Sequence, residues 1–208
     1  SDVCSSDLQM KLRMLNGSHS FLAYLGYLAG YAHINECMQD DSFREAAGRL
    51  MLNEQAPTLR ITNVDLTAYA DSLLDRFANP ALQHRTWQIA MDGSQKLPQR
   101  MLEGIRMHLE RNTAWPLLAL GVAGWMRYVS GTDEQGNAID VRDPLSDKFQ
   151  AILATSSDAE RVSALLTLNE IFGDDLPQNP VFVEAITSAY QRLVRLGARQ
   201  AVIETLKI

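Results

Sequence analysis

Cysteine is scarce in this sequence, which has only two in 208 residues. One of them, Cys4, lies in an N-terminal stretch that we set aside below, so Cys37 is left without an internal disulfide partner. A lone cysteine is typical of proteins from a reducing compartment, and we therefore expect a cytoplasmic protein. Because the sequence identifies no base near Cys37, we interpret this residue as a small buried side chain and not as a nucleophile.

Long apolar runs and an excess of positive charge are also missing. The longest apolar run, Leu117–Met126, is too short to cross a bilayer, and no signal peptide is visible. The net charge is −6 and no run of Lys or Arg offsets it, which argues against nucleic acid as a partner. The histidines also lack the spacing of metal ligands, so we expect no metal; they stand at positions 19, 33, 84 and 108.

Strand-like alternation is rare, and apolar residues recur instead at the spacing of helices. The pattern predicts an all-α, multihelical protein, and a length of 208 residues suits one sizeable domain. The glycine pairs Gly26/Gly30 and Gly121/Gly124 lie in helical patterns, so we interpret them as close helix packing and not as a dinucleotide-binding loop. The helical segments that we expect include a core helix from Phe21 to near Asn35, Trp115–Tyr128, Asp158–Phe172 and Pro180–Leu196.

The first eight residues, SDVCSSDL, match the translation of a widely used sequencing-adapter strand. We therefore expect residues 1–8 to be a disordered artefact fused to a truncated reading frame, and residues 9–208 to form the domain. The alternative is an ordinary disordered terminus rich in Ser and Asp.

Three polar side chains precede the first long apolar helix. Lys11, Asn16 and His19 fall near 0°, 140° and 80° on a helix that turns by about 100° per residue, so all three can face one pocket. Gly17 leaves open whether the helix runs through this stretch or begins near Asn16. An ammonium group can transfer a proton, and an amide and an imidazole can hydrogen-bond a carbonyl oxygen. This set of groups can interconvert an alcohol and a ketone without a metal; the simpler alternative is that they are solvated or capping groups.

The segment Lys11–Tyr31 resembles the start of the C-terminal domain of the polyol-specific long-chain dehydrogenases, the mannitol dehydrogenase family. The family signature Lys-x4-Asn-x2-His is met by Lys11, Asn16 and His19. Four further blocks resemble the same family in the same order: Asn79–Arg100, Leu118–Tyr128, Asp133–Asp140 and Phe172–Asn179. The resemblance implies a multihelical domain like the C-terminal domain of 6-phosphogluconate dehydrogenase.

The resemblance also implies the roles of individual residues. Lys11 would be the general acid/base, Asn16 would help to hold the oxyanion, and His19 would contact and orient the substrate. A basic residue before a later helix contacts substrate in the family; Lys96 is the nearest match, and Lys96 or Arg100 could pair with a substrate carboxylate. The nicotinamide cofactor, NAD or NADP, would be bound mainly by an N-terminal dinucleotide-binding domain that this chain lacks, so the chain would be half an enzyme.

The resemblance also indicates a substrate, with alternatives. The amino-acid sequences of these blocks are most similar to those of fructuronate reductases, which interconvert D-mannonate and D-fructuronate. This is the substrate pair that we expect. One alternative keeps the enzyme family but changes the substrate to mannitol or another polyol or sugar acid. The other alternative is a helical interaction domain without catalytic activity, in which the Lys-Asn-His pattern is a coincidence.

Overall fold

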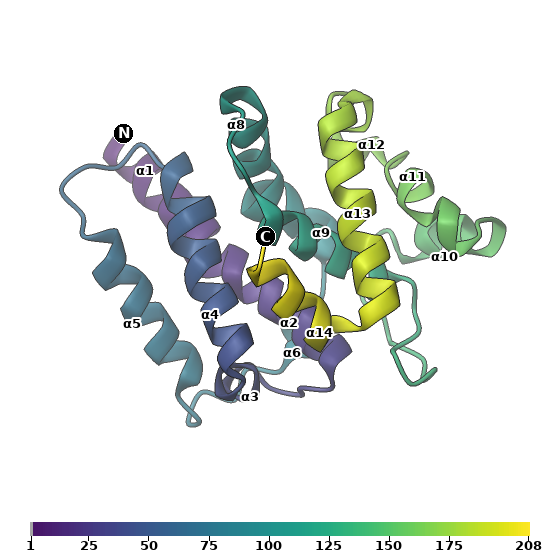
Figure 1. The fold of residues 1–208 in the computed structure, drawn as a ribbon, viewed down its shortest axis with the longest axis horizontal. Helices are drawn as coiled ribbons and strands as arrows, with labels where there is room; N and C mark the ends of the chain where they lie inside the picture. Colours follow the sequence, from purple (N-terminus) through teal and green to yellow (C-terminus); the bar gives the residue numbers. More distant parts are fainter. Residues whose placement is uncertain (1) are drawn as a thin grey trace.

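The computed structural model describes residues 2–208 and consists of helices joined by loops (Figure 1). Within these residues there is no strand, only two isolated β-bridges, which confirms the predicted all-α class. The α-helices are α1 (Asp2–Met10), α2 (Gly17–Ala29), α3 (Ile34–Gln39), α4 (Asp41–Arg49), α5 (Leu66–Ala78), α6 (Thr86–Ile89), α7 (Gly93–Leu97), α8 (Glu103–Arg111), α9 (Pro116–Val129), α10 (Ser146–Thr155), α11 (Arg161–Leu165), α12 (Asn169–Phe172), α13 (Pro180–Leu196) and α14 (Ala198–Leu206). Three π-helical segments interrupt or extend them: η1 (Lys11–Asn16), η2 (Leu50–Gln55) and η4 (Pro98–Leu102).

One helical rod runs without a break from α1 through η1 into α2. Met10 and Gly17, at the two junctions, both have right-handed helical backbone angles. The helix therefore runs through Gly17 and does not begin at Asn16. The structure also differs from the disorder that we expected at the N-terminus, because residues 2–8 are helical: they extend the rod, and most of the side chains from residue 4 to residue 8 are exposed. Residue 1 lies outside the described part.

The rod ends at Gly30, which has a left-handed φ of 93°. Glycine adopts this conformation without steric cost, so it is a common helix terminator. The predicted core helix therefore ends at Ala29, earlier than the expected end near Asn35.

The centre of the domain is the crossing of α2 and α9, both of which are almost wholly buried. A Cβ atom added at Gly124 would lie 3.0 Å from Leu25, and one added at Gly121 would lie 3.1 Å from Met101. A Cβ added at Gly26 would lie 2.4 Å from the sulfur of Cys37. Gly26, Gly121 and Gly124 thus allow helices to approach closely, as predicted, and Cys37 is buried at one of these contacts. The prediction is wrong for Gly30, where an added Cβ would meet no atom within 4 Å and the positive φ is what favours glycine.

Other helices pack against this crossing. The C-terminal helix α13 packs along α9, and α14 turns back across α2, α4 and α9. Figure 1 shows α5 at one end of the molecule and α10 and α11 at the other, with α9 and α13 between them. The predicted segment Asp158–Phe172 is divided between η5 (Asp158–Glu160), α11 and α12, whereas α13 has the expected bounds.

None of the helices within residues 2–208 combines the length and the apolar character needed to cross a membrane.

Candidate active site

The three π-helical segments meet beneath the start of α2. Segment η1 packs against both η2 and η4, and the Gln55 side-chain amide donates a hydrogen bond of 2.8 Å to the backbone carbonyl of Arg100. A Cβ atom added at Gly17 would lie 2.7 Å from the Gln55 amide nitrogen and 2.8 Å from that same carbonyl. Gly17 is therefore the residue that allows the three segments to touch. π-Helical turns are rare and are frequently found at functional sites.

Lys11, Asn16 and His19 line one cavity of about 220 Å³, beside this junction. The wider winding of η1 departs from the turn of about 100° per residue that we assumed, yet all three side chains reach the same space. Among the described residues, neither the Lys11 side chain nor the Asn16 side-chain amide forms a hydrogen bond or an ion pair with another part of the protein. Both groups are thus available to a ligand in the cavity.

The opposite wall of the cavity comes from later parts of the chain. Arg76 and Phe77 stand in the last turn of α5, and Leu82 and His84 stand in the loop that follows. Backbone hydrogen bonds hold this loop in place: the Ile34 N–H donates to the His84 carbonyl at 2.9 Å, and a β-bridge joins the neighbouring residues His33 and Arg85. The complete lining is Lys11, Leu15, Asn16, His19, Ile34, Arg76, Phe77, Leu82 and His84.

His19 is held by aromatic contacts. Its ring stacks on Phe77 with centroids 5.0 Å apart and meets the His84 ring edge-on at 5.5 Å. Burial, followed by the charges of His84 and Arg100, lowers the pKa of His19 to about 3, so the imidazole is neutral at physiological pH. Its Nε2 atom is buried and has no hydrogen-bond partner among the described residues. A polar group in the cavity would satisfy that nitrogen.

Lys96 and Arg100 lie near His19 but do not line the cavity. The Lys96 ammonium donates to the Ile89 carbonyl at 3.1 Å. The Arg100 guanidinium donates to the Ser20 hydroxyl at 2.9 Å and to the Asn16 carbonyl at 3.5 Å. Burial lowers the pKa of both cations. The structure therefore unites the first three predicted site residues and keeps these two behind them; substrate binding by Lys96 and Arg100 stays a prediction.

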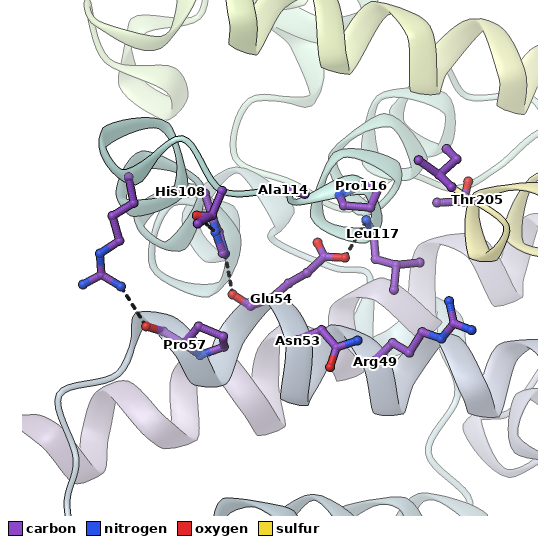
Figure 2. A pocket seen from close by; sticks show the side chains of 12 residues that line it. Arg49, Asn53, Glu54, Pro57, His108, Ala114, Pro116, Leu117 and Thr205 are labelled. Atoms are coloured by element: carbon purple, nitrogen blue, oxygen red, sulfur yellow. Dashed lines mark hydrogen bonds between the residues drawn. The ribbon is translucent and has the colours of Figure 1, made fainter.

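A larger cavity of about 380 Å³ lies elsewhere, at the start of α9 (Figure 2). The Glu54 carboxylate accepts hydrogen bonds from the backbone N–H groups of Leu117 and Leu118 at 2.9 and 2.8 Å. His108 bonds the Glu54 carbonyl at 2.6 Å and the Thr113 hydroxyl at 2.7 Å. These polar groups already satisfy one another, so we interpret this cavity as a structural network that joins η2 to α9.

Neither a dinucleotide nor a metal fits the described residues. The cavity at His19 is too small for a dinucleotide, and no strand–turn–helix unit that could cradle phosphates occurs within residues 2–208. Over the same residues no group of three or more His, Cys, Asp or Glu side chains could hold a metal ion.

Comparisons with known proteins agree with the helical architecture. The sequence model of the mannitol dehydrogenase C-terminal domain matches residues 6–194. The chain is 72% identical over 200 residues to the uncharacterized oxidoreductase YeiQ of Escherichia coli K12, covering 96% of the chain and 41% of that protein. It is 62% identical over 194 residues to the D-mannonate oxidoreductase of the same strain, covering 93% of the chain and 40% of that protein.

Among solved structures, the chain superposes on Pseudomonas fluorescens mannitol 2-dehydrogenase in ternary complex with NAD and D-mannitol, with a TM-score of 0.93 and 34% identity. That match covers 100% of this chain and 42% of the other. The chain thus spans about two fifths of the length of the relatives that it matches.

Proposed function

This chain belongs to the mannitol dehydrogenase family and matches the C-terminal domain of its members. We propose that it is the substrate-binding and proton-transfer half of an NAD-dependent oxidoreductase. The observation that carries the proposal is the single cavity shared by Lys11, Asn16 and His19. The cofactor would be bound mainly by a separate dinucleotide-binding domain, since the described residues offer no cradle for it.

Each of the three side chains has a distinct task in the proposed reaction. The neutral amine of Lys11 takes the hydroxyl proton as the alcohol carbon loses hydride, and the protonated amine returns a proton to the carbonyl oxygen in the reverse direction. The Asn16 amide donates a hydrogen bond to the oxygen as negative charge develops on it. The unpartnered Nε2 of His19 bonds a substrate hydroxyl and so fixes the orientation of the carbon chain. Bound NAD supplies the hydride acceptor.

The substrate pair that we propose is D-mannonate and D-fructuronate. The support is the 62% identity to D-mannonate oxidoreductase, compared with 36% to two proteins from Saccharomyces cerevisiae named as mannitol dehydrogenases. Mannitol or another polyol is the second candidate, which the close superposition on mannitol 2-dehydrogenase favours. A helical interaction domain without activity is the weakest alternative, because it leaves the buried, unpartnered His19 nitrogen unexplained.

A chimera tests the proposal directly. The chain would replace the corresponding 40% of E. coli D-mannonate oxidoreductase, and NADH absorbance would report the oxidation of D-mannonate and of D-mannitol. We expect turnover of D-mannonate, and a kcat lowered by about 10²- to 10⁴-fold in Lys11→Ala, because proton transfer contributes mainly in the transition state.

The matched control is Lys207→Ala, which removes an exposed lysine that pairs with Glu204 near the chain end and should leave kcat unchanged. A folded chimera that oxidises mannitol but not mannonate would replace the proposed substrate. A Lys11→Ala variant with the kcat of the unsubstituted chimera would refute the proton-transfer role.

A further inference from the structure

We propose that Arg76 is the residue that binds the substrate carboxylate, with His84 beside it, in the cavity lined by Lys11, Asn16 and His19. This inference rests on the proposed function and deepens it, because it assigns a sugar acid, and not a neutral polyol, to the cavity. It also assigns the carboxylate to the wall formed by α5 and the loop after it, and not to Lys96 or Arg100.

The charge of the cavity is the first argument. Its lining includes the Arg76 guanidinium, which stays charged, the Lys11 amine and two imidazoles, and it contains no Asp or Glu among the described residues. Lys96 and Arg100 add positive charge from behind His19. A chain with a net charge of −6 thus gathers cations around one small space. Such a space favours an anion, whereas a neutral polyol would gain nothing from the charge.

The freedom of Arg76 is the second argument. Lys96 and Arg100 already donate to oxygen atoms of the protein, and neither lines the cavity. Arg76 lines it, and its guanidinium has no hydrogen bond or ion pair with the described residues. A guanidinium can grip a carboxylate with two parallel hydrogen bonds, which lysine cannot do.

The buried Nε2 of His19 is the third argument, and it is independent of charge. This nitrogen has no partner among the described residues, while its ring is fixed between Phe77 and His84. A hydroxylated ligand would satisfy it. The cavity volume of about 220 Å³ lies below the usual range of about 300–1,000 Å³ for drug-sized ligands and suits a small molecule of this kind.

The reacting carbon and the carboxylate of the proposed substrate are far enough apart to contact two different walls of the cavity. D-Mannonate is oxidised at C5, and its carboxylate is C1, at the other end of the carbon chain. The reacting carbon must lie at Lys11 on η1, so the carboxylate needs a cation on another wall. Arg76, in the last turn of α5, is the cation that the lining offers there.

Ligand binding to this chain can be measured without turnover. The chain has four histidines, so its imidazole ring protons give few NMR signals, which single His→Gln variants would assign. Sodium D-mannonate, D-mannitol and NAD⁺ would each be titrated to tens of millimolar at low ionic strength. We expect D-mannonate to shift the His19 and His84 signals with a Kd at least tenfold lower than that of D-mannitol.

Arg76→Gln should weaken D-mannonate binding by about 10- to 100-fold, the worth of hydrogen bonds to a charged partner, and should leave D-mannitol binding within about twofold. Arg76→Lys should retain part of the affinity because it keeps the charge. Arg195→Gln, an exposed arginine on α13 outside the cavity lining, is the matched control and should change neither ligand.

Three results would overturn the inference: equal affinity for D-mannonate and D-mannitol, an Arg76→Gln variant that binds D-mannonate as tightly as the parent, or no saturable shift with D-mannonate. A fourth would be tighter, Arg76-dependent binding of NAD⁺, which would assign this arginine to a cofactor phosphate. The proposed function fails separately, if the chimera binds D-mannonate through Arg76 but does not oxidise it.

Discussion

Replacing Gly17 with alanine should destabilise the domain, although alanine is the better helix former. The new Cβ would lie 2.7 Å from the Gln55 amide nitrogen and 2.8 Å from the Arg100 carbonyl oxygen. Both distances are below van der Waals contact, and the carbonyl belongs to the backbone of η4, which cannot simply rotate away. The substitution also pushes apart the Gln55–Arg100 hydrogen bond of 2.8 Å.

The magnitude follows from three opposing contributions. Overpacking a close contact costs about 1–3 kcal/mol, and losing the hydrogen bond costs about 0.5–1.5 kcal/mol. The higher helix propensity of alanine stabilises the folded state by about 1 kcal/mol. The net loss is about 0.5–3.5 kcal/mol, which for a domain of this size lowers the Tm by roughly 1–14 °C.

Gly48→Ala is the matched control, because it makes the same change where there is room. Gly48 lies inside α4, and its added Cβ would meet only Leu74, at an ordinary distance of 3.5 Å. This variant should be more stable than the parent by about 0.5–1 kcal/mol. Circular dichroism at 222 nm during thermal and urea unfolding would measure both variants. If Gly17→Ala were as stable as Gly48→Ala, the close meeting of the three π-helical segments would be refuted.

The remaining predictions concern three buried or exposed groups and the chain as a whole. Burial raises the pKa of Glu54 from 4.5 to about 7. Between these two pH values the folded state keeps a proton on Glu54 that the unfolded state releases, so the free energy of unfolding falls as pH rises. The stability contributed by the protonated carboxyl group is therefore fully present below about pH 4.5 and lost as pH rises through 7. Comparing the urea unfolding of the parent with Glu54→Gln should therefore show a stability difference that changes by about 2–3 kcal/mol from pH 5 to pH 8; a constant difference would contradict it. Burial raises the pKa of the Cys37 thiol to about 12, so only the exposed Cys4 should react with Ellman's reagent at pH 8 in the folded chain, and two rapidly reacting thiols would count against the structure. The chain alone should not oxidise D-mannonate with NAD⁺, and measurable NADH formation by the purified chain would contradict the half-enzyme proposal.

Much of the fold could be predicted from apolar spacing, because helices with one or more buried faces leave a regular pattern. The observed α9, Pro116–Val129, lies one residue from the expected Trp115–Tyr128, and α13 has the expected bounds. The spacing of apolar residues did not predict the local departures from α-helical winding. The apolar periodicity did not predict the π-helical turns at η1, η2 and η4, which pack against one another from distant parts of the sequence. The helical state of residues 2–8 was missed for a related reason, since a polar stretch continues a helix that the core has already nucleated.

Some residues of the candidate site could be recognised from the sequence, and others only from the structure. Lys11, Asn16 and His19 lie within nine residues, so their spacing and the family resemblance could identify them together. Arg76 and His84 carry no local motif, and neither could be assigned to the site from the chain alone. The predicted cations Lys96 and Arg100 show the converse: they are near His19, but hydrogen bonds to the protein hold them outside the cavity.

The sequence by itself determined the helical class and the core helices, and it suggested three candidate polar groups within nine residues, because these features depend on residues close together along the chain. Tertiary structure alone decided that α5 and the His84 loop close the cavity, that its lining is cationic, and that the Nε2 of His19 is left without a partner. The physical reason is that burial, and the sum of charges around a buried atom, depend on distances in space between residues that are about sixty positions apart in the chain.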